Sequence, residues 1–176
     1  MKLKSHSLAL CSQGIALLVV CSWISIPFGP VPFTLQTFAL VFILVLFKPK
    51  EAIFCVLVYL LAGFIGLPVF AGFRGGIATC LGPTGGFLWG FAIAIVITSF
   101  IAAMSEKLQV KLLSAALFML ISYICGLVQF AFVTGTTFVE AFFVSVVPFV
   151  IFDALKLFVG CIAALKVKSS LSRLRR

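Results

Sequence analysis

Long apolar stretches alternate with short polar or charged interruptions along this chain of 176 residues. Measured between these interruptions, the apolar stretches cover residues 8–26, 34–47, 52–68, 87–104, 112–133 and 142–165. A helix needs about 20 predominantly apolar residues to cross the hydrocarbon core of a bilayer. The pattern therefore predicts an all-α integral membrane protein, with six transmembrane helices in a single domain that covers residues 1–176.

The amino-acid composition supports a membrane protein. Hydrophobic residues make up 64% of the chain and charged residues only 10%, whereas about 25% of residues are charged in a typical soluble domain. A soluble fold of this size could not bury so much apolar surface, because small domains leave a large share of their surface exposed. The composition excludes a soluble enzyme and, despite a net charge of +9, a nucleic-acid-binding module.

The basic residues fall mainly on one side of the predicted membrane topology. With six helices, both termini share a side with the loops at 48–51 and 105–111, and this side holds 11 of the 13 basic residues. The opposite side holds Arg74 alone, and Lys156 lies within the last apolar stretch. Because short loops rich in Lys and Arg stay in the cytoplasm, we expect an N-in/C-in, multi-pass protein of the plasma (inner) membrane.

The N-terminus and the cysteines add two negative expectations. Lys2 and Lys4 precede an apolar run as in a signal peptide, but no small-x-small cleavage site follows, so we expect a retained helix. The six cysteines form no C-x-x-C pair and the single histidine is His6. We therefore expect no metal site, no redox site and no cofactor.

An acid and a base lie three residues apart inside the last apolar stretch, as Asp153 and Lys156. Each charge at the centre of a membrane helix costs about 2.5–3.5 kcal/mol on insertion scales, and such charges usually mark a pathway or a binding site. At this spacing the two side chains share one helix face and can compensate each other. The alternatives are a polar recognition face in a cavity and an ion pair that only joins helices.

A glycine-rich segment, residues 72–86, contains the only basic residue of the outer side, Arg74. Glycine lets a backbone approach a ligand closely, and the planar guanidinium can bind an anionic group; the alternative is a flexible external turn. The segment is not a phosphate-binding loop, since Pro83 stands where that motif needs lysine. The chain is therefore not expected to hydrolyse ATP itself.

A third polar patch spans residues 31–37. Its prolines predict a turn on the outer side, and Gln36 and Thr34 could line the same cavity, although Thr34 could equally cap the second helix. The aromatic residues Tyr59, Phe87 and Trp89 could be cavity walls or could lie at the membrane interface.

Small residues repeat every four positions from the glycine-rich segment into the fourth predicted helix, which indicates close helix packing rather than ligand contact. They are Gly82, Gly86, Gly90, Ala94 and Thr98. Weaker versions of the same spacing in the first predicted helix could face a partner protein. They are Ser5 with Ala9 and Ser12 with Ala16.

Taken together, these motifs resemble the BioY family, the biotin-binding S components of energy-coupling factor (ECF) transporters. The resemblance rests on PVPFTLQT at 30–37, Tyr59 and GFIGLPVFAG at 63–72, GPTGGFL at 82–88 and DALK at 153–156. It covers nearly the whole chain in order. It implies a six-helix membrane fold with a biotin pocket open to the outside and lidded by loops, and it implies no enzymatic activity.

The resemblance also assigns roles to single residues. It implies that Asp153 accepts hydrogen bonds from the ureido N–H groups of biotin and that Lys156 donates to the ureido carbonyl. Arg74 is our chemical candidate for the valerate carboxylate. The remaining expected substrate-binding residues are Gln36, Tyr59, Gly75, Gly76, Thr84, Gly85 and Phe87.

The implied partners are a transmembrane T component and cytoplasmic ABC-type ATPases, which would use the ATP. Ser5, Ala9, Ser12 and Ala16 are the expected docking residues. The chain departs from the family pattern in having Phe87 where tyrosine is common, Ile151 and Phe152 where proline and glycine are common, and Ser5, Cys11 and Ser12 among the alanine positions of the first helix.

Other functions fit part of the sequence. The chain could be an S component for another vitamin, or a solitary secondary transporter in which Asp153 carries protons. A structural membrane scaffold is a third possibility; it predicts no ligand binding and tolerance of Asp153→Asn.

Overall fold

The computed structural model describes the backbone of residues 5–27 and 29–174, and the side chains of residues 7–27 and 29–171. The described chain is almost entirely helical. Its elements, in order, are α1 (Ser5–Trp23), β1 (Ser25–Ile26), β2 (Phe33–Thr34), α2 (Gln36–Leu46), α3 (Pro49–Phe64), the 3-10 turn η1 (Ala71–Phe73), α4 (Ile77–Leu81), α5 (Gly85–Ala103), α6 (Leu108–Thr134), α7 (Phe138–Ser145) and α8 (Val147–Leu174).

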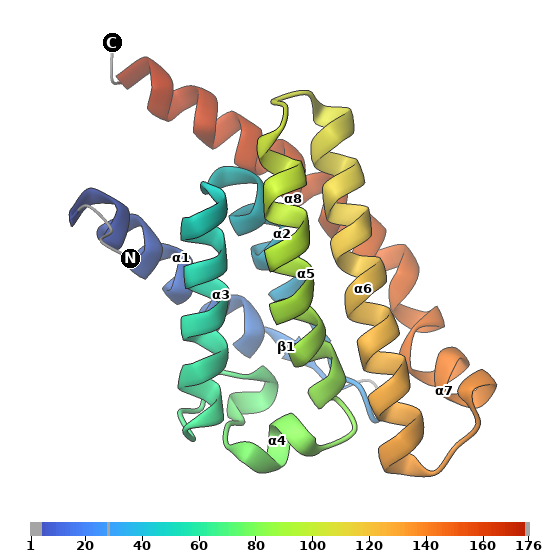
Figure 1. Ribbon diagram of the computed structural model, residues 1–176. Coiled ribbons are helices and arrows are strands. Elements are labelled where there is room, and N and C mark those ends of the chain that lie inside the picture. The colour runs from blue at the N-terminus through green and yellow to red at the C-terminus, as the bar shows by residue number, and fades with distance from the viewer. Residues whose placement is uncertain (1–4, 28, 175–176) are drawn as a thin grey trace.

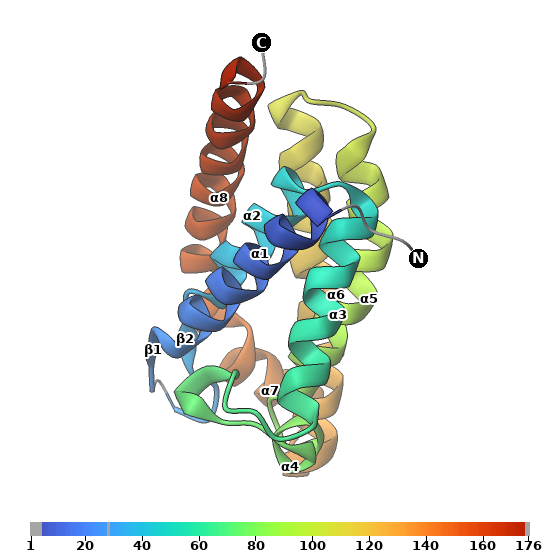
Figure 2. The ribbon, with the colours of Figure 1, turned by 90° about the vertical axis from the view of Figure 1, so that its left-hand side faces the viewer.

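Three of these helices are long and apolar enough to cross a membrane, at Gly85–Ala103, Leu108–Thr134 and Val147–Leu171. The described part of α1 and the whole of α2 are apolar but shorter. In α2 most side chains are buried, because this helix lies inside the bundle between α1 and α8 (Figure 2). A helical membrane protein is thus confirmed, with a two-residue antiparallel strand pair, β1 and β2, as its only described sheet.

The helices α3, α5 and α6 run side by side, while α1 and α8 cross the bundle at a slant (Figure 1). Close contact between α5 and α6 depends on glycine. A Cβ atom at Gly86 would overlap the backbone carbonyl of Cys125, and one at Gly90 would lie 2.8 Å from the Cα atom of Ser122. The predicted packing role of the repeated small residues is confirmed for these two positions, whereas Gly82 lies outside α5.

Capping residues explain where several helices begin and end. Pro49 occupies the first turn of α3, where its missing N–H costs nothing, and the Glu51 carboxylate accepts the backbone N–H of Lys48 at 3.1 Å. Thr137 and Glu140 cap α7 reciprocally. Helix α6 ends at Gly135, which has a left-handed conformation with φ of 68°.

The last predicted apolar stretch, 142–165, contains a break that the apolar pattern did not reveal. Residues 142–145 belong to α7, the chain turns at Val146, and α8 begins at Val147. Pro148, in the first turn of α8, explains the break, because it has no N–H to donate to the Val144 carbonyl and so cannot continue the hydrogen bonds of α7.

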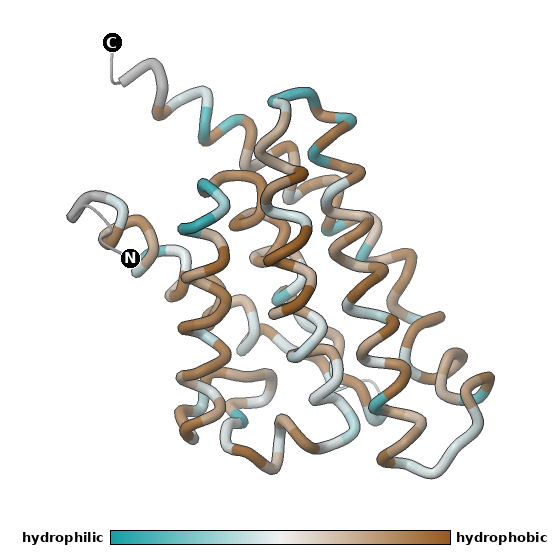
Figure 3. Tube along the Cα trace, in the orientation of Figure 1, coloured by the Kyte–Doolittle hydropathy of each residue, from teal (hydrophilic) through white to brown (hydrophobic). Residues whose placement is uncertain are grey.

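Polar residues gather at one end of the bundle (Figure 3). There Glu106, in the loop between α5 and α6, accepts a hydrogen bond from Lys168 at 2.6 Å and lies 3.5 Å from the Lys111 ammonium. Partial burial opposes ionisation of Glu106, but the Lys168 hydrogen bond and the two nearby positive charges outweigh it and lower the pKa of this carboxyl. The other end of the bundle carries α4, the loop before it and the α6–α7 turn (Figure 1).

Candidate functional site

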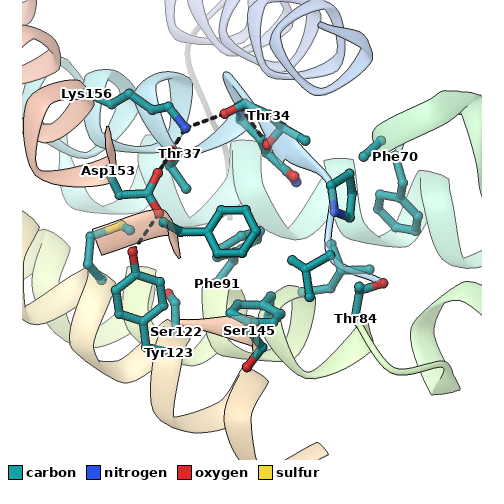
Figure 4. Close-up of a pocket in the computed structure, with 18 of the residues that line it drawn as sticks. Thr34, Thr37, Phe70, Thr84, Phe91, Ser122, Tyr123, Ser145, Asp153 and Lys156 are labelled. Atoms are coloured by element: carbon teal, nitrogen blue, oxygen red, sulfur yellow. Dashed lines mark hydrogen bonds and ion pairs between the residues drawn. The ribbon is translucent and has the colours of Figure 1, made fainter. Parts of the chain in front are cut away.

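A cavity of about 100 Å³ lies between the strand segment, the α3–α5 connection and helices α5, α6 and α8. A single water needs only about 10–15 Å³ on this measure, so the cavity has room for a small organic molecule. Its walls are mainly apolar, and the large side chains among them are Phe70, Phe87, Phe91, Met119 and Phe149. A small number of polar groups face each other across these walls (Figure 4).

Asp153 and Lys156 form the polar centre of this cavity. Both lie on α8 and are buried, with 6% and 9% of their surface exposed. The Lys156 Nζ atom donates a hydrogen bond to Asp153 Oδ1 at 2.9 Å. The i, i+3 spacing thus produces the expected ion pair, and the pair lies on the cavity wall.

Neighbouring elements hold the Asp153 carboxylate in place. The Thr37 hydroxyl, at the start of α2, donates to Oδ1 at 2.9 Å. The Tyr123 hydroxyl, on α6, donates to Oδ2 at 2.6 Å. These two residues were not among the predicted site residues. A tyrosine inside an apolar helix is a signal that could have identified Tyr123, whereas Thr37 reaches Asp153 only through the packing of α2 on α8.

Lys156 is held from the strand pair. Its Nζ atom donates to the backbone carbonyl of Thr34 at 2.6 Å and lies 3.7 Å from the centre of the Phe33 ring. The Thr34 hydroxyl in turn accepts the backbone N–H of Gln36 at 3.3 Å. Thr34 therefore lies on the cavity wall, whereas the N-cap of α2 is Leu35 and no side chain caps this helix.

Six of the ten predicted substrate-binding residues line the cavity. They are Asp153, Lys156, Arg74, Gln36, Thr84 and Phe87. Arg74 is exposed and makes no ion pair with any described acid. Phe87 packs edge-to-face against Tyr123, with 6.5 Å between the ring centres.

The other four predicted residues lie behind the wall. Tyr59 is fully buried and accepts a hydrogen bond from Gln36 Nε2 at 2.9 Å, so Gln36 separates it from the cavity. Gly75 packs against the Leu67 carbonyl and Gly85 against the Cys80 carbonyl, where a side chain would collide. Gly76 has φ of 88° and allows the turn into α4.

Further polar residues support or line this site. Gln129, on α6, donates to the carbonyls of Cys80 and Gly82 at 2.9 and 2.8 Å, which fixes the turn that carries Thr84. Ser122 and Ser145 also line the cavity. The Ser122 hydroxyl donates to the Phe118 carbonyl at 2.8 Å, whereas the buried Ser145 hydroxyl has no hydrogen-bond partner among the described groups.

Trp89 does not line the cavity. It is 43% exposed on the outside of the bundle, and its indole N–H donates to the Cys80 carbonyl at 3.2 Å. Of the predicted docking residues, Ala9, Ser12 and Ala16 are exposed on α1. The side chain of Ser5 lies outside the described residues, as does that of His6.

Comparison with known proteins finds a family model and relatives that match nearly the whole chain. The model of the BioY family matches residues 1–173. The biotin transporter BioY of Thermotoga maritima is 40% identical over 153 residues, which cover 87% of this chain and 90% of that protein. The probable biotin transporter BioY of Pyrococcus horikoshii is 36% identical over 168 residues, covering 96% of this chain and 99% of that protein.

The fold also matches a solved structure, the S-component for biotin from an ECF-type ABC transporter. The TM-score is 0.87 at 22% sequence identity, and the match covers 96% of this chain and 95% of the other. At 22% identity the structural likeness establishes only the fold. Membership of the family rests on the match to the family model and on the sequence relatives. The chain described here belongs to the BioY family.

Proposed function

We propose that this chain is the biotin-binding S component of an ECF transporter, a membrane subunit that captures biotin from outside the cell and is not an enzyme. The family match and the names of the relatives support transport of biotin. The chemistry of the cavity supports biotin as the ligand independently of these relatives.

The hydrogen-bonding capacity that Asp153 and Lys156 leave unused is the observation that carries this proposal. An ionised carboxylate has about four acceptor sites and an ammonium has three N–H donors. Asp153 already accepts from Thr37, Tyr123 and Lys156, and Lys156 already donates to Thr34 and Asp153. One acceptor and one donor therefore remain, on side chains that touch each other.

A cyclic urea fits this pair, because each of its edges places an N–H beside the carbonyl oxygen. The N–H would donate to Asp153 and the carbonyl would accept from Lys156, while the apolar cavity walls would enclose the fused rings of biotin. Arg74, which is exposed on the loop that forms another part of the wall, would bind the carboxylate of the biotin side chain.

The direct experiment measures biotin binding to the purified chain and to Asp153→Asn. The variant keeps the size of the side chain but loses its charge and leaves Lys156 uncompensated, so we expect biotin affinity to fall about ten- to a hundredfold, as for hydrogen bonds to charged groups. Glu140→Gln, the same exchange at an exposed acid outside the cavity, should bind like wild type.

Competition identifies the ligand class. Desthiobiotin retains the urea ring and should displace biotin, whereas thiamine should not. Displacement by thiamine and not by desthiobiotin would show that the chain is an S component for another vitamin. Unchanged affinity in Asp153→Asn would contradict the assignment of the urea to this pair.

The transport cycle belongs to the same proposal. We propose six membrane helices with both termini in the cytoplasm of a plasma-membrane protein, and delivery of biotin inward together with a T component and ATPases. The exposed residues Ala9, Ser12 and Ala16 would face the T component. Uptake by the lone chain that is proton-dependent and insensitive to mutation of the ATPases would instead favour a solitary secondary transporter.

A further inference from the structure

The loop at residues 65–76 forms part of the cavity wall and is tied together by its own backbone. Phe70, Ala71 and Arg74 lie on the wall. The backbone N–H of Phe70 donates to the Arg74 carbonyl at 2.9 Å, and that of Gly76 donates to the Gly63 carbonyl at 2.7 Å. These bonds close the loop on itself and fix its base at the end of α3, and the buried Phe70 ring packs edge-to-face on Tyr59 of that helix.

Two side chains at the end of α1 hold this loop in place. The indole N–H of Trp23 donates to the Pro68 carbonyl at 2.7 Å. The hydroxyl of the fully buried Ser22 lies within hydrogen-bond distance of the Val69 carbonyl and of the Val19 carbonyl of α1, and its single proton can be donated to either. Neither Trp23 nor Ser22 lines the cavity. Their contacts with the loop therefore act on its position and not on a ligand.

Ring stacking adds a third attachment. The Trp23 ring stacks on that of Phe73, with 5.0 Å between the centres and 29° between the planes. Phe73 has φ of 57°, and among the described residues it is the only one other than glycine with positive φ. This left-handed conformation costs about 1–2 kcal/mol in a residue with a side chain, and it persists where surrounding contacts enforce it. Trp23 supplies such a contact.

We propose that Trp23, together with Ser22, is a positioning residue that fastens the loop at residues 65–76 over the cavity and thereby sets how fast a ligand enters and leaves. The attachment extends from α1 through the Pro68 and Val69 carbonyls and the Phe73 ring to Phe70 and Arg74 on the wall. The choice of biotin as probe rests on the proposed function; the attachment of the loop does not.

The kinetic experiment measures association and dissociation rates of biotin for purified Trp23→Phe and Trp23→Leu. Phenylalanine keeps a ring for stacking and removes the N–H donor, whereas leucine removes both. One hydrogen bond is worth about 0.5–1.5 kcal/mol, so we expect both rates to rise about two- to tenfold in Trp23→Phe and further in Trp23→Leu. The dissociation constant should change less than either rate, because a loosened loop opens the path in both directions.

Two buried serines provide a matched pair. Ser22→Ala removes a hydroxyl that contacts the loop, and it should accelerate both rates. Ser114→Ala removes an equally buried hydroxyl that donates to the Val110 carbonyl of its own helix, α6, at 2.7 Å, and it should change neither. A purely structural role for Trp23 would lower the melting temperature or the number of binding sites without raising the association rate.

A second readout needs no ligand. Ser122 is buried on the cavity wall, and in Ser122→Cys the reaction of the new thiol with a small membrane-impermeant methanethiosulfonate reports access to the cavity. We expect this reaction, followed site by site by mass spectrometry, to be about two- to tenfold faster when Trp23→Leu is added.

The outcomes separate this inference from the proposed function. Biotin rates within twofold of wild type in Trp23→Leu, or an unchanged thiol reaction in folded protein, would overturn the role of Trp23. A wild-type protein that binds no biotin, combined with a faster thiol reaction in the Trp23 variant, would refute the biotin assignment and support the attachment of the loop.

Discussion

Two buried serines on the cavity wall differ only in what their hydroxyl groups contact. Ser122 donates to a carbonyl of its own helix, whereas Ser145 has no hydrogen-bond partner among the described groups. A buried hydroxyl without a partner loses its hydration and gains nothing in return, at a cost of about 1–3 kcal/mol. Ser145 is thus a position at which an unpaired hydroxyl lowers the stability of the protein.

We therefore expect Ser145→Ala to raise the free energy of unfolding of the ligand-free protein by about 1 kcal/mol, since it removes an unsatisfied polar group. Ser122→Ala, which removes a satisfied hydroxyl of equal burial, should give no such gain. Thermal unfolding of the two variants in the same detergent compares them directly. A Ser145→Ala variant less stable than Ser122→Ala would show that the Ser145 hydroxyl has a partner in the protein.

At the residue scale, the most informative sequence signal was the free-energy cost of placing a charge inside a membrane helix. Asp153 and Lys156 stood out because charges inside a membrane helix are expensive, and both lie in the cavity. Tyr59 was expected on the wall, but it lies one layer deeper, behind Gln36. Thr37 shows why such errors occur: its contact with Asp153 joins positions 116 residues apart, and helix packing rather than local spacing creates it.

At the scale of elements, the glycines of α5 show how helix packing positions the residues of the cavity. Gly86 and Gly90 allow α5 to lie directly against the backbone of α6, so the side chains that these two helices contribute to the cavity are placed by backbone contact. Gly160 in α8 is different, because a Cβ atom there would lie 3.2 Å from a methyl carbon of Val41 and 3.4 Å from the Phe38 carbonyl oxygen, so these neighbours need to move by only a few tenths of an ångström.

We expect Gly86→Ala to destabilise the protein by about 1–3 kcal/mol, as overpacking does in other tightly packed interiors. Gly160→Ala should stay within about 1 kcal/mol of wild type, because the small displacement of Val41 is offset by the higher helix propensity of alanine. Unfolding midpoints in detergent test both variants. Equal stability of the two would mean that α5 and α6 can separate without cost.

The apolar pattern located helices well where charges interrupt it and poorly where they do not. Lys48 and the charged residues around Glu106 mark turns that the structure contains. The break between α7 and α8 lies inside one continuous apolar stretch and depends on Pro148 alone. The strand pair and η1 are too short for any periodic signal, although the loop after α3 and the segment before α2 both contribute to the cavity.

At the scale of the whole molecule, the charges and the cavity divide the bundle into two ends. Lys48, Lys111 and Lys168 lie close to Glu51 and Glu106, at the end of the bundle where polar residues gather (Figure 3). The loop before α4, which contains Arg74, lies at the other end together with α4 and the α6–α7 turn (Figure 1). Since basic loops stay in the cytoplasm, this division predicts that the Arg74 end, with the loop over the cavity, faces the outside.

Cysteine labelling of intact cells tests this orientation with two exposed positions at opposite ends of the bundle, Lys107 in the α5–α6 loop and Thr136 in the α6–α7 turn. A membrane-impermeant maleimide should label Thr136→Cys in intact cells and Lys107→Cys only after permeabilisation. The native cysteines from Cys11 to Cys161 are buried or half-buried, so the parent protein should label weakly and serve as the control. The reverse pattern would place the cavity loop in the cytoplasm, where it could not admit biotin from outside, and would contradict uptake as proposed even if the isolated chain bound biotin.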